Sequence, residues 1–155
     1  MSLFQQPASR GFTLIELILV LMVLGLSTVI VLPNIDKGMR ERNVRQSALA
    51  LAAAARDLRS QALFKGIPQQ LVLDVAQNSY LVARGREVQL PTDVKFTEIE
   101  GGESLDGGVR QFVFFPNGST LGGQIDLSGG ATATPYSIRF HPLTGKIEVL
   151  RGDKS

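Results

Sequence analysis

Residues 8–33, ASRGFTLIELILVLMVLGLSTVIVLP, decide how this chain is organised. From Phe12 to Leu32 the stretch is apolar apart from one carboxylate, at Glu16, and three hydroxyl side chains. It is long enough to cross the hydrocarbon core of a bilayer as a helix, which takes roughly 20 residues. A charge within such a span costs about 2.5–3.5 kcal/mol on insertion scales, so Glu16 is a functional-site hypothesis.

Two other kinds of segment have a similar apolar run. A cleaved secretory signal peptide has an apolar core of about 7–15 residues and a small-x-small site. Gly25-Leu26-Ser27 supplies such a site, and the mature chain would then start at Thr28. The acid inside the run and its continuation to Leu32 argue against this alternative. A simple signal anchor explains the length, but it gives no reason for Glu16 or for Gly11 directly before the run.

The segment Gly11-Phe12-Thr13-Leu14-Ile15-Glu16-Leu17 resembles the processing site of type IV prepilins and type II secretion pseudopilins. In that family a membrane aspartyl peptidase cuts after the glycine and methylates the new amino terminus. The resemblance implies leader cleavage between Gly11 and Phe12 and N-methylation of Phe12. It also implies an assembly role for Glu16, because in the family this carboxylate pairs with the N-terminal ammonium of a neighbouring subunit.

The rest of the chain changes from a helical to a strand pattern. Between Asp36 and Lys65 apolar residues recur at helical spacing, which predicts an amphipathic helix. Pro33 is expected to kink this long helix without ending it, whereas Gly66 is a C-cap and Pro68 blocks continuation. The apolar positions are Val44, Ala48, Leu51, Ala52, Ala55, Leu58, Ala62 and Leu63. Short alternating runs punctuated by glycine doublets then predict strands. Those runs are 71–75, 79–83, 87–90, 94–100, 109–115, 124–127, 137–141 and 146–150.

These patterns predict an α+β fold with one long N-terminal helix and antiparallel β-sheets in a small sandwich. The resemblance implies the same arrangement, a pilin-like β-sandwich with the helix packed on the sheets. The first half of the helix is expected to be transmembrane. The predicted divisions are a prepilin leader over residues 1–11, a transmembrane and assembly helix over 12–35, an amphipathic helix stem over 36–66, and a periplasmic β domain over 67–155.

The C-terminal half carries a second resemblance. Phe115-Pro116-Asn117-Gly118, Gly123–Leu127, Ile138-Arg139-Phe140 and Thr144–Ile147 are similar to the H-type minor pseudopilin domain, which FimT- and FimU-like minor pilins share. This resemblance implies a structural subunit near the tip of the type II secretion pseudopilus, supporting export of folded proteins. Two alternatives stay open: a FimT- or FimU-like minor pilin of a type IV pilus that binds DNA, and a bitopic anchored binding module.

The same resemblance implies the partners and the location. The expected partners are I-, J- and K-type minor pseudopilins, the major pseudopilin, the prepilin peptidase, the inner-membrane assembly platform and membrane lipid. The chain is expected in the bacterial inner membrane as a single-pass protein with its C-terminal domain in the periplasm, and then in a periplasmic pseudopilus. Counting positive charges gives the opposite orientation, because Lys37, Arg40, Arg42 and Arg45 follow the span while only Arg10 precedes it. The family motif is preferred over this bias.

Composition narrows the remaining classes of function. The 155 residues include no cysteine and one histidine, which excludes disulfides, thiolate metal sites and multi-histidine metal sites. The net charge of +2 gives no global attraction to nucleic acid, which is not expected as a partner. The acidic residues Glu98, Glu100, Glu103 and Asp106 lack the EF-hand pattern, and neither a metal nor a cofactor is expected. His141 has no recognisable catalytic partners, so the chain is not expected to be an enzyme.

Overall fold

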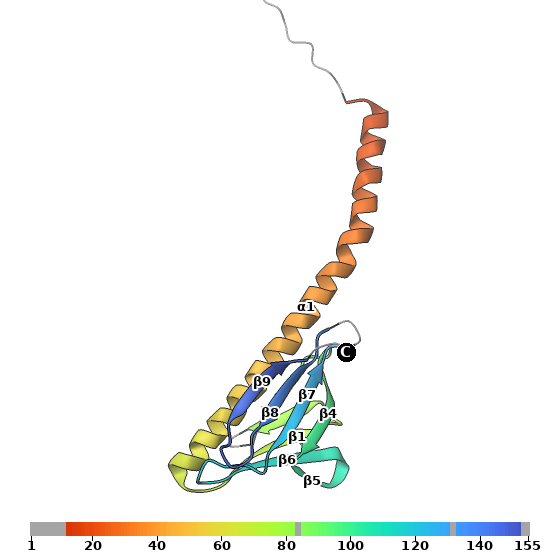
Figure 1. The fold of residues 1–155 in the computed structure, drawn as a ribbon. Helices are drawn as coiled ribbons and strands as arrows, with labels where there is room; N and C mark the ends of the chain where they lie inside the picture. Colours follow the sequence, from red (N-terminus) through yellow and green to blue (C-terminus); the bar gives the residue numbers. More distant parts are fainter. Residues whose placement is uncertain (1–11, 83–84, 131–132, 153–155) are drawn as a thin grey trace, which may run out of the picture. The chain divides into compact units, whose positions relative to one another are not determined.

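The structure is a computed structural model that describes residues 12–82, 85–130 and 133–152, and the side chains of residues 28–37 lie outside that description. Helix α1 (Leu14–Lys65) is followed by strands and one short 3-10 helix (Figure 1). In chain order these are β1 (Gln69–Asp74), β2 (Ser79–Val82), β3 (Arg86–Gln89), β4 (Lys95–Gly101), β5 (Glu103–Ser104), η2 (Asp106–Gly108), β6 (Val109–Phe114), β7 (Gly123–Ser128), β8 (Tyr136–Phe140) and β9 (Ile147–Arg151). The chain divides into two compact units, Met1–Asp36 and Lys37–Ser155.

Helix α1 continues through Pro33, as the sequence predicted. Proline removes one backbone hydrogen bond from a helix interior, and the residues on both sides of Pro33 nevertheless remain helical. The helix ends at Lys65, one residue before Gly66, whose φ of 66° lies in the left-handed region. The N–H of Gly66 donates to the carbonyl of Ala62 at 3.0 Å, which confirms Gly66 as the predicted C-cap.

In the second unit, one face of α1 is buried against the sheets. The predicted positions Val44, Ala48, Leu51, Ala52, Ala55, Leu58 and Ala62 are all 0% or 1% exposed. Most of these are alanines, and small side chains let a helix approach a sheet closely. Leu63 is the exception to the predicted pattern, since it is 46% exposed. The last turn has therefore left the buried face by Leu63.

The strands form two antiparallel sheets. One has the order β3-β2-β1-β6-β5 and the other the order β4-β7-β8-β9. The predicted strands are confirmed with small changes at their ends, and those predicted over residues 137–141 and 146–150 pair with one another as β8 and β9. Strand β5 was not predicted. It is two residues long and pairs with β6 through Glu103 and Gln111, so it carries no readable periodicity.

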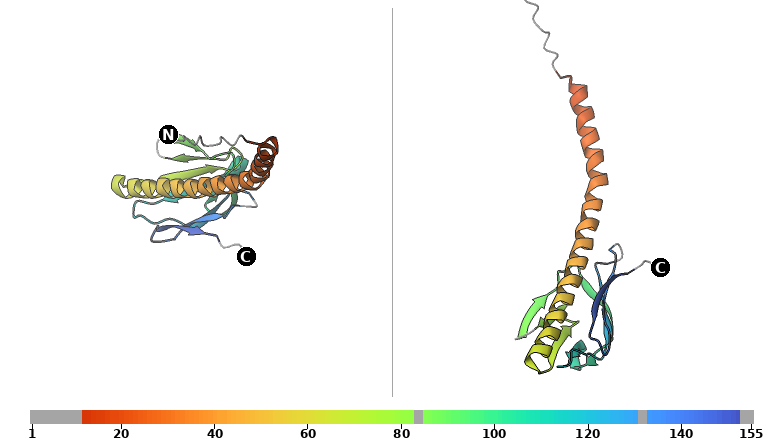
Figure 2. Two further views of the ribbon diagram at one scale, coloured as in Figure 1. Left: turned by 90° about the horizontal axis from the view of Figure 1, so that it is seen from above. Right: turned by 60° about the vertical axis from the view of Figure 1, so that its left-hand side comes forward.

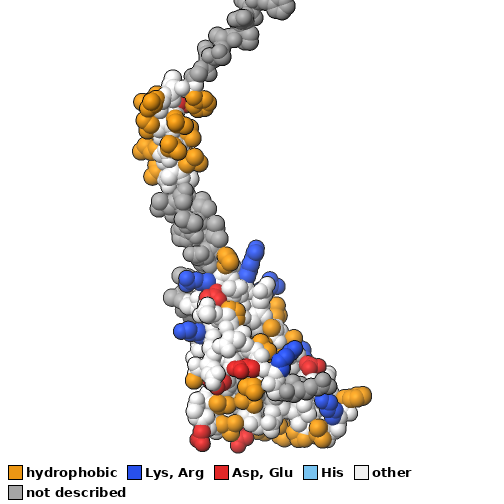
Figure 3. Space-filling model, turned by 180° about the vertical axis from the view of Figure 1, so that it is seen from behind, with side chains coloured by type: hydrophobic (Ala, Val, Ile, Leu, Met, Phe, Trp, Pro, Cys, Tyr) orange, Lys and Arg blue, Asp and Glu red, His pale blue; other side chains and the backbone are white. Residues whose placement is uncertain are grey.

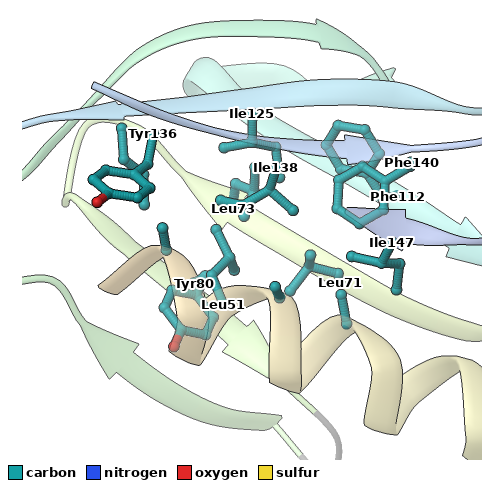
Figure 4. Packing of buried hydrophobic residues seen from close by; sticks show 14 of the residues in the cluster. Leu51, Leu71, Leu73, Tyr80, Phe112, Ile125, Tyr136, Ile138, Phe140 and Ile147 are labelled. Atoms are coloured by element: carbon teal, nitrogen blue, oxygen red, sulfur yellow. The ribbon is translucent and has the colours of Figure 1, made fainter. Parts of the chain in front are cut away.

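The core of this unit lies where α1 meets both sheets. The two views of Figure 2 show the helix between the sheet that contains β1 and the sheet that contains β8. Side chains from all three layers point toward one another in Figure 4, including Leu51 from the helix and Leu71 from β1. The ring of Phe112 packs on that of Phe140 with their centroids 5.0 Å apart, which joins the two sheets directly.

Candidate assembly site

Glu16 lies in the first turn of α1. Its backbone N–H donates to the carbonyl oxygen of Thr13 at 3.0 Å and approaches Thr13 Oγ1 at 3.4 Å. Thr13 thus caps the helix, and a threonine followed three residues later by a glutamate is the capping-box pattern. The position of Glu16 has a local structural reason as well as the functional one that the sequence suggested.

A helix start suits a carboxylate, because the unpaired N–H groups there carry a partial positive charge. Glu16 is exposed and forms no salt bridge with any described side chain. It can therefore accept an ammonium group from elsewhere. Phe12 precedes the capping residue and is 77% exposed, so an amine created at Phe12 would be accessible. Gly11, the other predicted processing residue, lies outside the described residues.

The side chains around Glu16 are exposed on every side of the helix. Each residue from Phe12 to Ser27 is exposed, including Leu14 at 77% and Met22 at 65%. A helix that is apolar all round needs lipid or other helices to cover it. No helix in the described part of the chain combines the length and the apolar composition that a membrane crossing takes.

The arginines of the amphipathic helix stem, residues 36–66, lie in two kinds of environment. Arg40, Arg42 and Arg45 are exposed, and basic side chains gather at the upper end of the sheet domain in Figure 3. Arg56 instead donates to the carbonyl of Ile147 at 3.0 Å, at the free edge of β9. Arg59 donates to the loop carbonyls of Gly118 and Thr144. Sequence periodicity gives no sign that Arg56 and Arg59 bind backbone carbonyls.

The acidic residues considered for calcium lie on several elements. Glu98 and Glu100 are on β4, Glu103 is on β5 and Asp106 is in η2, and all four are exposed. Within the described ranges, no three histidine, aspartate or glutamate side chains are close enough to hold a metal ion.

His141 belongs to a charged cluster on the β8–β9 hairpin. Its Nε2 lies 2.7 Å from Glu148 Oε2, and Lys146 Nζ lies 2.6 Å from Glu148 Oε1. Hydrogen bonds from Lys146 and from His141 lower the pKa of the Glu148 carboxyl to about 2. Sequence analysis missed this cluster, although all three residues lie in the two neighbouring strands predicted over 137–141 and 146–150. The contact between His141 and Glu148 joins the two strands of the hairpin.

Comparisons with known proteins place these features in a family. Residues 7–32 match the family model of the prokaryotic N-terminal methylation motif. The chain is 33% identical to the type II secretion system protein H of Xanthomonas campestris pv. campestris over 122 residues. The aligned region covers 77% of this chain and 71% of that protein. The predicted resemblance to H-type pseudopilins is thereby confirmed.

Solved structures agree on the fold. The minor pseudopilin EpsH from the type 2 secretion system of Vibrio cholerae matches with a TM-score of 0.56 and 14% identity, over 70% of this chain and 97% of that one. The type IV minor pilin FimU of Pseudomonas aeruginosa matches with a TM-score of 0.51 and 15% identity, over 72% of this chain and 92% of that one. Both therefore show the pilin-like arrangement of a helix on antiparallel sheets. The chain belongs to the type II secretion system protein H family and is a minor pseudopilin of type II secretion.

Proposed function

We propose that this pseudopilin is cut between Gly11 and Phe12, methylated at Phe12, and held in the inner membrane by residues 12–35 with its sheet domain in the periplasm. It then joins the pseudopilus near the tip, with I-, J- and K-type minor pseudopilins and the major pseudopilin below. It acts by packing and carries out no catalysis. The prepilin peptidase, the assembly platform and membrane lipid are its other partners.

The observation that carries this proposal is the exposed Glu16 carboxylate at the start of α1, where the apolar side chains from Leu14 to Leu26 are all exposed. Such a helix is suited to be covered first by lipid and then by other helices. The motif match over residues 7–32 includes both Glu16 and the proposed cut.

The proposed role of Glu16 follows from the energetics of charge burial. Burying a carboxylate or an ammonium group alone among apolar side chains costs free energy. When the two are buried together, each neutralises the charge of the other. The ammonium of a processed neighbour would be such a partner for Glu16. Because the pair forms only at one relative height of two helices, it fixes the axial stagger between subunits.

The processing step is tested by the intact mass and N-terminal sequence of the chain taken from native membranes. We expect a chain that starts at Phe12 with one added methyl group. Gly11→Val is expected to leave the leader attached, because a bulky side chain at Gly11 would obstruct the peptidase. A chain that starts at Thr28 would indicate a secreted domain, and an uncut chain would indicate a simple anchor. Either result would refute the proposal.

The role of Glu16 is tested with Glu16→Ala. We expect normal insertion and processing but loss of co-purification with the other pseudopilins. Ser27→Ala is the matched control, because the Ser27 hydroxyl donates to the carbonyl of Val23 at 2.8 Å within its own helix. Equal recovery of pseudopilins with both variants would contradict the proposed pairing.

A further inference from the structure

Apolar side chains are exposed at the end of the sheet domain where α1 terminates. Phe64 is 93% exposed, Leu143 85%, Leu121 75% and Leu63 46%. We refer to these four residues as the end patch. They come from the last turn of α1, the β6–β7 loop and the β8–β9 turn. Figure 3 shows exposed hydrophobic side chains along this lower end of the domain.

Arg59 brings these three segments together. Its Nε donates to the carbonyl of Gly118 at 2.8 Å, and its Nη2 donates to the carbonyl of Thr144 at 2.9 Å. A side chain on Gly118 would lie 3.1 Å from Leu63, so the β6–β7 loop rests on the last turn of the helix. The two loops also touch, because a side chain on Gly122 would lie 3.1 Å from the ring of Pro142. The patch is therefore one surface built from distant parts of the chain.

Leu143 has an unfavourable backbone conformation in addition to its exposure. Its φ is 64°, in the left-handed region that costs an L-residue with a bulky side chain free energy and that glycine adopts freely. Burial does not offset this strain, since the side chain is 85% exposed. Strain of this kind often marks a residue whose side chain has a function. A leucine that is both strained and exposed is best explained by a contact with another molecule.

A shallow hollow of about 530 Å³, open to solvent, lies along the last turn of α1 and includes part of the patch. Its lining includes the apolar side chains of Leu63 and Phe64, and Lys65 is the one charged residue among the described residues that line it. The Lys65 ammonium donates to the neutral amide oxygen of Gln61 at 2.7 Å, so its charge is not compensated there. The hollow can thus take an apolar side chain that has an acidic group beside it.

We propose that the end patch is the docking surface for the globular domain of a different pseudopilin, one that presents apolar side chains flanked by acidic residues. This inference rests on the proposed function. The four side chains expose on the order of 500 Å², which is the size of a functional patch but less than the roughly 800 Å² per partner of a stable free-standing complex. A partner already held beside this chain by the filament needs only such a small contact.

Charge selects a different subunit over a second copy. Arg59 and Lys65 both lie at the patch, and both donate hydrogen bonds to neutral oxygens. Two copies meeting patch to patch would bring these cations together, while Asp57, the acid on the same stretch of helix, already accepts a hydrogen bond from Gln61 at 2.8 Å. An acidic rim on the partner would instead complement both cations, which favours that orientation.

The test places a photo-crosslinking residue at position 64 or 143 of the full chain, in cells that contain the complete secretion system with each other pseudopilin carrying its own epitope tag. Position 75 is the control. Val75 is 40% exposed but follows the far end of β1, roughly 20 Å from the patch for a six-residue strand. A crosslinker at position 19, in the exposed first part of α1, detects contact with any neighbouring pseudopilin and so shows whether the chain has assembled.

We expect positions 64 and 143, but not 75, to crosslink to one tagged pseudopilin. The double variant Phe64→Ser/Leu143→Gly is expected to retain that pseudopilin at least tenfold less well than Val75→Ser does. Leu143→Gly suits the backbone at this position, so its melting temperature is expected to be unchanged or higher. If Leu143→Gly alone also retains less of that pseudopilin, the loss is one of binding and not of folding.

The other outcomes separate this inference from the proposed function. Crosslinks to a second copy of this chain would overturn the choice of partner. Crosslinks to a pseudopilin from position 19 alone would overturn the docking surface and leave the proposed function standing. An absence of pseudopilin crosslinks from every position would overturn both.

Discussion

Replacing Gly145 by alanine tests how the helix end and the two loops are held together. Gly145 lies in the β8–β9 turn with a φ of 61°. An added Cβ would overlap the carbonyl oxygen of Gly118 and would lie 2.7 Å from Arg59 Nε. Because the first of these neighbours is backbone, the β8–β9 turn itself has to move away.

The magnitude follows from two contributions. A side chain in the left-handed region costs roughly 1–2 kcal/mol. Displacing the turn also breaks or weakens the hydrogen bonds of Arg59 to Gly118 and Thr144, each of which contributes about 1–1.5 kcal/mol or somewhat more because the donor is charged. We expect Gly145→Ala to lower the free energy of unfolding by about 3–5 kcal/mol. Gly66→Ala is the matched control, since its φ is 66° and nothing lies within 4 Å of the added Cβ.

Urea unfolding of the full chain in detergent micelles, followed by tyrosine fluorescence, measures both variants. The chain has no tryptophan and two tyrosines, Tyr80 and Tyr136, which are 3% and 9% exposed in the core of the sheet domain. The signal therefore reports that domain and not the N-terminal helix. We expect Gly145→Ala to lose about 2–3 kcal/mol more than Gly66→Ala. Equal losses would show that the turn accommodates the side chain, which would refute the steric argument.

Three further predictions concern the sheet domain. Phe112→Ala empties a site that is 1% exposed and is expected to cost about 3–5 kcal/mol in the same unfolding assay, so a loss below about 1 kcal/mol would contradict its place in the core. The pKa of Glu148 is lowered from 4.5 to about 2 mainly by Lys146, so its stabilisation is complete above pH 4.5 and is lost as pH falls through about 2. In a carboxyl NMR titration, Lys146→Met should raise this midpoint, and an unchanged midpoint would exclude Lys146 as the cause. Glu41→Gln removes an exposed ion pair with Arg151 at 2.7 Å and should change the unfolding free energy by less than about 1 kcal/mol, so a larger loss would mean that the pair is not a surface contact.

Most of the fold could be predicted because its signals are local. Helical spacing marked the face of α1 that becomes buried, and Gly66 with Pro68 marked its end. Alternation between glycine turns marked the longer strands. The prediction missed β5, whose two residues are too few to show a period, and it placed Leu63 on the buried face although that side chain is 46% exposed.

For the candidate site too, some residues could be predicted from the sequence and others only found in the structure. A short motif identified Glu16 and Phe12 as the residues of interest, and the structure adds the Thr13 cap that holds Glu16 at the helix start. The partners of Arg56 and Arg59 could not be predicted. These bonds join residues 91, 59 and 85 positions apart in the chain, and sequence periodicity carries no information about such contacts.

The sequence by itself determined that the chain has a prepilin-like start, one long helix and a series of antiparallel strands. The reason is that helix and strand periods, turn glycines and a contiguous motif each depend on neighbouring residues. Only the tertiary structure decided the order of the strands in the two sheets, the attachment of both loops to Arg59, and the surface formed by Phe64, Leu121 and Leu143. Those features depend on which distant segments bury one another's apolar faces, and packing sets that choice.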